Sequence, residues 1–224
     1  MSFSTVVCAD PQAAAGACGE RLLAILSDTL QERDTANIAI SGGTTPKLLF
    51  QYLAKAGCDW SRVHLFWVDE RAVPPGDPQS NYTLAHDHWL GPVEYPAANI
   101  HRIPAELPVS EAAERYADEI RGHFQLNEGG FPVFDAIQQG MGADAHTASL
   151  FPGEALVLDE TGIAAAVYVE KLKAARITLL PGVLTRARNT LMLVTGEDKA
   201  PALGRVWNGP EALLEMPVQL TRQH

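Results

Sequence analysis

The chain contains few cysteines and no long apolar run. Its 224 residues include only Cys8, Cys18 and Cys58. Because this odd number follows neither a C-x-x-C nor a zinc-like spacing, we expect free thiols in a reducing compartment, the cytoplasm. No apolar stretch approaches the roughly 18 residues of a membrane-spanning helix, and the first residues lack the basic region and apolar stretch of a secretory signal. We therefore expect no membrane partner and no targeting segment.

Basic residues are also in short supply. The chain has 17 Lys and Arg against 27 Asp and Glu, a formal net charge of −10 at pH 7. The basic residues are scattered without a run, which argues against nucleic acid or an anionic membrane as partner. An anionic substrate would need a local basic pocket. No low-complexity linker divides the chain, so we expect one domain over residues 1–224. The sequence does not give the oligomeric state, and a monomer is our expectation.

Apolar, β-branched runs alternate with helical periodicities along the chain. Strands are predicted at residues 38–40, 63–68, 134–137, 163–169, 177–180 and 191–194. Amphipathic helices are predicted around residues 22–30, 48–53, 82–90 and 113–124. Several of the strands are apolar on both faces, as in a covered parallel sheet. The alternation indicates an α/β fold with a doubly wound, mostly parallel sheet.

The segment FDAIQQGMGADAHTASLFPG, residues 134–153, carries the first chemical signal. An apolar run that ends in Gly140 and Gly142 is typical of a strand leaving a sheet at its carboxyl end, where open α/β sheets bind ligands. His146 has an unperturbed pKa near neutrality, and Asp144 is placed to fix its tautomer. The alternative is that Asp144 only bonds turn amides and His146 caps the next helix. The spacing leaves both interpretations open.

A second signal is the turn SGGTTP, residues 41–46, between a predicted strand and a predicted helix. Thr45 suits the N-cap of that helix and Pro46 its first position. Gly42 and Gly43 would let backbone N–H groups approach an anion, and the hydroxyls of Thr44 and Thr45 would add contacts. The glycine spacing fits neither a Walker A loop nor G-x-G-x-x-G, which disfavours ATP and dinucleotides. A phosphate site and an ordinary turn remain as alternatives.

Two further charged clusters follow apolar strands. In WVDERAVP, Asp69 and Glu70 are candidates for acid–base work, and Arg71 for binding a carboxylate, a phosphate or a developing oxyanion. The alternative is a local ion pair that fixes the loop. In VTGEDKA, Lys199 opens a helix and is placed to reach an anion as a point charge, unless it is simply solvated.

Metal-assisted chemistry and a serine nucleophile are disfavoured. His86 and His88 are two residues apart on a predicted helix, so they point to different faces. No other group of His, Cys and carboxylates has ligand spacing, and we expect no metal. Ser149 follows His146 closely, but no G-x-S-x-G elbow surrounds it.

The clusters together resemble the 6-phosphogluconolactonase family. SGGTTP, WVDERAVPPGDPQSNY, GMGADAHTASLFPG and RITLLPGVL with VTGEDKA occur in the family's order over about residues 38–200. The SGG[ST]TP motif is shared with the glucosamine-6-phosphate isomerases, which carry Asn-Glu in place of Leu150-Phe151 and lack the arginine after the Asp-Glu pair. The lactonase branch is therefore favoured. The chain departs from the family at Ala145, where the family has glycine, and at Gln138-Gln139, where it has aliphatic residues.

The resemblance implies an esterase of 6-phospho-D-glucono-1,5-lactone, without metal or cofactor, on a modified Rossmann-like sheet. It implies that His146, oriented by Asp144, activates water. The implied substrate-binding residues are Gly42, Gly43, Thr44, Thr45 and Lys199 at the 6-phosphate, Arg71 at the substrate or the developing oxyanion, Arg176 as a further phosphate contact, and Asp69, whose part in binding stays open. Two alternatives remain, a sugar-phosphate isomerase of the glucosamine-6-phosphate deaminase type and a non-catalytic sugar-phosphate-binding protein.

Overall fold

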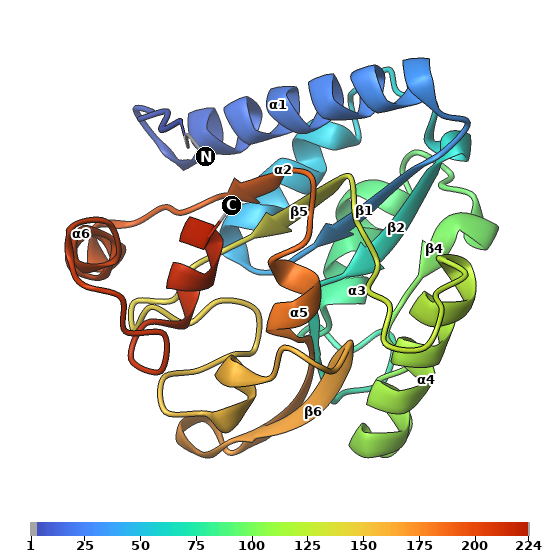
Figure 1. Cartoon of the computed structure of the whole chain (residues 1–224). Coiled ribbons are helices and arrows are strands. Elements are labelled where there is room, and N and C mark those ends of the chain that lie inside the picture. Colours follow the sequence, from blue (N-terminus) through green and yellow to red (C-terminus); the bar gives the residue numbers. More distant parts are fainter. Residues whose placement is uncertain (1–3, 224) are drawn as a thin grey trace.

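Five parallel strands form the main sheet of the computed structural model, which describes residues 4–223 (Figure 1). Their order across the sheet is β4-β2-β1-β5-β8, and every neighbouring pair is parallel. The bounds are β1 (Ala36–Ile40), β2 (Val63–Trp67), β4 (Ile100–His101), β5 (Ala136–Gln139) and β8 (Thr190–Met192). The predicted α/β fold with a mostly parallel sheet is confirmed.

Helices cover the sheet. The bounds are α1 (Pro11–Glu32), α2 (Thr44–Leu53), α3 (Asn81–Ala85), α4 (Val109–His123), α5 (Pro181–Leu184) and α6 (Ala200–Asn208), and a π-helical turn, η2 (His86–Leu90), continues α3. In Figure 1, α1 and α2 pack together on one side, while α4 lies on the other side of the strands. No helix in residues 4–223 is long and apolar enough to cross a membrane.

A second, antiparallel sheet consists of β3 (Asp69–Arg71), β7 (Ala174–Leu179) and β6 (Ala164–Val169), in that order. The predicted strands 163–169 and 177–180 therefore lie outside the parallel sheet. Only residues 170–173 join β6 to β7, and Lys173 adopts a left-handed conformation there (φ 47°). Because a parallel crossover needs about a dozen residues or more, a link of this length forces a hairpin.

The predicted start of α2 was wrong by two residues. The N-cap is Gly43, with φ 125°, a conformation that glycine adopts without strain. Pro46 thus occupies the third helical position, where its missing N–H still costs no intrahelical bond. The Thr45 hydroxyl lies 2.6 Å from the hydroxyl of Thr195 instead, and ties α2 to the segment after β8.

The carboxyl ends of the central strands meet at one edge of the parallel sheet. β1 pairs with β5, and β5 with β8, in parallel register. The segments that follow these strands, residues 41–45, 140–149 and 193–199, therefore lie near one another, and β3 continues directly from β2. Every site residue predicted from the sequence belongs to one of these segments or to the β3–β7 pair.

Candidate active site

Asp144 and His146 form a hydrogen-bonded pair. His146 Nδ1 lies 2.5 Å from Asp144 Oδ1, and the His146 backbone N–H donates to the same oxygen at 3.2 Å. With Nδ1–H donated to the carboxylate, Nε2 carries the free lone pair. The His146 side chain is 31% exposed, so part of the ring is open to solvent. The pair has the arrangement of a general base and the group that orients it.

The surroundings of His146 keep the ring neutral. Its pKa is lowered to about 4, chiefly because burial disfavours the charged ring; Asp69 opposes the shift, and Arg176 and Lys199 add to it. The second oxygen of the Asp144 carboxylate pairs with Lys171. Phe151 stacks on His146 with ring centroids 4.3 Å apart. A neutral imidazole is the form that accepts a proton.

A tight turn fixes the position of this pair. The Gly142 N–H donates to the His146 carbonyl at 2.9 Å, and the Ala145 N–H donates to the Gly142 carbonyl at 3.0 Å. A Cβ on Gly142 would lie 2.0 Å from His146 Nδ1 and 2.6 Å from Asp144 Oδ1, so only glycine fits. Ala145 has φ 65°, which explains the family preference for glycine at this position.

Asp69 lies at the centre of a buried polar cluster. Its Oδ2 accepts from the Ser149 hydroxyl at 2.7 Å, and its carbonyl accepts from Asn81 Nδ2 at 2.8 Å. A Cβ on Gly42 would lie 1.9 Å from Asn81 Oδ1. The Asn81 side chain occupies the space that a side chain at Gly42 would need, so only glycine fits there. Contacts therefore run from the 41–45 turn to Asn81, from Asn81 to Asp69, and from Asp69 to Ser149. Ser149 is fully buried and is held as a donor.

Arg71 and Arg176 lie directly opposite each other in the register of β3 and β7. Arg71 donates to the Gln79 carbonyl at 2.5 Å. Burial lowers the pKa of Arg176, an effect that Asp69 opposes and Arg71 reinforces. The buried Nε atoms of both arginines have no hydrogen-bond partner within residues 4–223. Two like charges side by side, with unpaired donors, suit an anionic ligand.

The Glu70 carboxylate holds a loop in place, which is a different part from the acid–base role that the sequence suggested for it. Its side chain points to the opposite face of β3 from Asp69 and Arg71, because successive strand residues alternate. The carboxylate accepts from the backbone N–H groups of Arg71, Asn81 and Tyr82 at 2.7, 2.7 and 2.8 Å, and from the Ser80 hydroxyl at 3.0 Å. These bonds fix the loop before α3 and the start of that helix. Burial raises the Glu70 pKa, and the bonds oppose the shift.

The 41–45 turn and Lys199 lie on neighbouring segments. No side chain caps the N-terminus of α2, which leaves its first N–H groups available to a ligand. Lys199 precedes α6 and pairs with Asp198. Its charge contributes to the lowered pKa of His146, so the ammonium is within electrostatic reach of the Asp144–His146 pair.

The two glutamines that replace family aliphatic residues brace this edge of the sheet. Gln138 Oε1 accepts from the Ser41 N–H at 3.2 Å, and Gln139 Oε1 accepts from the Thr147 hydroxyl at 3.0 Å. Both side chains are 1% exposed. They link the end of β5 to the turn after β1 and to the His146 turn.

Sequence analysis missed Asn81, Lys171, Ser149 as a donor to Asp69, and Thr195. Asn81 lies within the family-like segment QSNY, which was the one available signal. Lys171 comes from the β6–β7 link and reaches Asp144 only through the fold. Within residues 4–223, one group of side chains is spaced to hold a metal ion. It consists of His64, His101 and His123, which lie on other elements than the residues of the candidate active site.

Comparisons with known proteins agree with the geometry. A family model described as glucosamine-6-phosphate isomerases/6-phosphogluconolactonase matches residues 9–224. The chain is similar to the 6-phosphogluconolactonase of Synechocystis, with 40% identity over 189 residues covering 84% of this chain and 77% of that one. For the Haemophilus influenzae protein of the same name the identity is 38% over 185 residues, covering 81% and 77%.

A solved 6-phosphogluconolactonase structure from Thermotoga maritima has 27% identity and a TM-score of 0.82, covering 92% of this chain and 89% of that one. Sequence and fold thus agree over most of the length of each relative. The chain belongs to the glucosamine-6-phosphate isomerase/6-phosphogluconolactonase family.

Proposed function

We propose that the chain hydrolyses 6-phospho-D-glucono-1,5-lactone to 6-phosphogluconate, the lactonase step of the oxidative pentose phosphate pathway. The relatives named above are 6-phosphogluconolactonases. The observation that carries the proposal is the meeting of a neutral, oriented His146 with the cations Arg176 and Lys199 at one edge of the sheet. A base beside a group of cations suits the hydrolysis of an ester that carries a phosphate.

The proton path follows from the tautomer of His146. Nε2 takes a proton from a water molecule as its oxygen attacks the lactone carbonyl carbon, and Asp144 supports the imidazolium that forms. The tetrahedral intermediate then opens by breaking the bond from the former carbonyl carbon to the ring oxygen. Nε2–H returns the proton to that oxygen, so His146 ends the cycle neutral. One residue serves both steps, and neither Ser149 nor a metal is needed.

The substrate is held by groups around this base. The open N-terminus of α2, built by Gly42, Gly43, Thr44 and Thr45, binds the 6-phosphate together with Lys199. Arg71 and Arg176 bind the substrate from the β3–β7 pair, and the Asp69 charge favours the charged form of Arg176. Because the phosphate is remote from the carbonyl, its binding energy serves to position the lactone for attack.

The decisive experiment is a lactonase assay on freshly generated lactone with spontaneous hydrolysis subtracted. The wild type should accelerate hydrolysis, and His146→Ala should lower kcat by roughly 10²–10⁴-fold with little change in substrate affinity. His86→Ala, which removes an exposed histidine of η2, is the matched control and should retain full activity. An unchanged kcat in His146→Ala would refute the mechanism. Ammonia release from glucosamine 6-phosphate, without lactone turnover, would assign the isomerase branch instead.

A further inference from the structure

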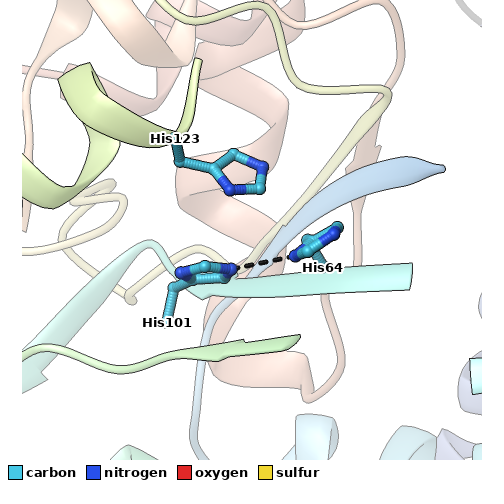
Figure 2. A group of neighbouring side chains, drawn as sticks. All are labelled: His64, His101 and His123. Atoms are coloured by element: carbon cyan, nitrogen blue, oxygen red, sulfur yellow. Dashed lines mark hydrogen bonds between the residues drawn. The ribbon is translucent and has the colours of Figure 1, made fainter. Parts of the chain in front are cut away.

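Three histidines from separate parts of the sequence meet on the parallel sheet. His64 belongs to β2, His101 to the edge strand β4, and His123 ends α4. One ring nitrogen from each lies within 4.8 Å of the others. His64 Nδ1 is 3.0 Å from His101 Nε2, and Figure 2 shows the His123 ring facing both. The centroid distances, 5.2, 4.5 and 4.7 Å, describe a close triangle of imidazoles.

Neighbouring side chains fix the orientation of two of these rings. His101 Nδ1 lies 2.8 Å from Glu119 Oε1, so Nδ1–H donates to the carboxylate and Nε2 carries the lone pair. His123 Nε2 donates to Asn37 Oδ1 at 2.6 Å, which leaves the lone pair on Nδ1. In proteins, a histidine that binds a metal usually donates its other N–H to a carboxylate or a carbonyl oxygen. His101 and His123 already have such partners.

We propose that His64, His101 and His123 form a binding site for Zn²⁺. A tetrahedral ion with Zn–N bonds of about 2.0–2.1 Å holds its nitrogens about 3.3 Å apart. The His64–His101 pair is already at 3.0 Å, and the three ligand atoms lie within 4.8 Å of one another, so His123 has to move toward the other two rings to close the triangle. The ligand atoms are His101 Nε2, His64 Nδ1 and His123 Nδ1. His64 Nδ1–H donates to His101 Nε2 without the ion, so His64 moves this proton from Nδ1 to Nε2 when zinc binds. Water completes the shell from the side where His64 and His123 are half-buried.

The chemistry of the three rings suits a cation. Imidazole nitrogen is a usual ligand of Zn²⁺, and three protein ligands with one water complete its tetrahedral shell. Without a metal, the same rings make one mutual hydrogen bond and pack on Phe66, whose ring stacks 4.3 Å from His101. A bound ion would join β2, the two-residue strand β4 and the end of α4.

The site is separate from the candidate active site. His64 is the second residue of β2, whereas Asp69 follows the carboxyl end of that strand. Five residues of extended chain span roughly 16 Å. We therefore expect the metal to stabilise the fold without taking part in lactone hydrolysis.

Zinc binding is tested with untagged, metal-free protein dialysed against micromolar Zn²⁺, with bound metal counted by elemental analysis. The wild type should bind one ion per chain, and its melting temperature should rise with Zn²⁺. Cobalt should give the visible absorption of a tetrahedral site. The variants His64→Gln and His123→Gln should lose the ion and the rise in melting temperature. Glu119→Gln, which retains all three ligands, should weaken binding about 10–100-fold.

Two controls separate this site from other histidines. His146→Ala should still bind one ion, because the candidate active site supplies no ligand, and His86→Gln should do the same. Circular dichroism identifies any variant that fails to fold, and Glu119→Gln then carries the test alone. A wild type that binds no zinc would overturn the proposal. So would equal zinc binding by His64→Gln, His123→Gln and the wild type.

Discussion

At the scale of single residues, the fold keeps His146 uncharged, which is the form that the proposed base requires. A histidine with its ordinary pKa near 6.5 would be half protonated in mildly acidic solution. Burial and the nearby cations lower the pKa of His146 to about 4. The ring is therefore available as a base across the whole physiological pH range.

The pH profile of kcat/KM tests this shift. Protonation of His146 removes the base, so the net enzymatic rate should be level from pH 8 to pH 5 and fall only with an apparent pKa of about 4. Lys199→Ala removes one of the cations that lower the pKa, and should move this acid limb to higher pH. A wild-type limb near pH 6.5, or a limb unmoved by Lys199→Ala, would contradict the assignment.

Ala145 is a second residue whose backbone sets a prediction. At φ 65° an alanine is strained by about 1 kcal/mol relative to glycine. Ala145→Gly should therefore raise the melting temperature by roughly 2–4 °C. Ala112→Gly, at a buried helical position in α4, should lower it instead, by the same measurement. Destabilisation by both substitutions would mean that the turn carries no strain.

The contacts of a site residue could be predicted from the sequence only where its partner is close to it in the sequence. Asp144 and His146 are two residues apart, and the sequence sufficed to suggest their hydrogen bond. Lys171 reaches Asp144 across 27 residues and His64 meets His123 across 59, contacts that depend on how the strands assemble. The buried glutamines show the same limit. Gln138 meets Ser41, which follows β1 and is 97 residues away, only because β1 and β5 pair in the sheet.

At the scale of elements, the β3–β7 pair, which we propose binds the substrate, carries a local cost in stability. Like charges directly opposite each other on antiparallel strands are destabilising by about 0.2–1 kcal/mol. Arg71 and Arg176 are placed in this way, and each retains an unpaired buried Nε. The arrangement makes sense if an anionic substrate offsets the repulsion when it binds.

Arg176→Gln should separate these two effects. Removing one charge should raise the melting temperature slightly, while kcat/KM on the phosphorylated lactone should fall about 10–150-fold, the range for a lost hydrogen bond to a charged group. Arg115→Gln, on the exposed surface of α4, is the matched control and should change neither quantity. If melting temperature and activity fell together in Arg176→Gln, the arginine would be structural.

Most strands could be predicted from the sequence. The exceptions are a strand made of charged residues and a pair of strands joined by a short link. Every predicted strand exists, but β3 consists of Asp-Glu-Arg, which no apolar pattern reveals. The sequence did not say which of the predicted strands lie outside the mostly parallel sheet; the strands at 163–169 and 177–180 do, because the short link at Lys173 permits only a hairpin. Loop length is the physical signal that would have corrected the topology.

At the scale of the whole molecule, histidines at both ends of the sheet have a lowered pKa. Burial lowers the pKa of His64, His123 and His146 in the folded chain, the last two to about 4. Unfolding exposes the rings and returns each pKa to about 6.5. Between these values the unfolded chain binds protons that the folded chain does not, so the histidines favour folding fully above pH 6.5 and progressively less as the pH falls toward 4.

The urea midpoint in EDTA should therefore fall as the pH is lowered from 6.5 to 4. Glu70 acts in the opposite sense at the acid end, because its raised pKa lets the folded chain take up a proton first. Comparison with His123→Gln isolates one histidine from this background. The variant has one fewer proton to take up on unfolding, so its midpoint should decline less steeply with falling pH, whatever its stability at pH 7. Parallel declines in the two proteins would mean that His123 titrates normally in the folded state.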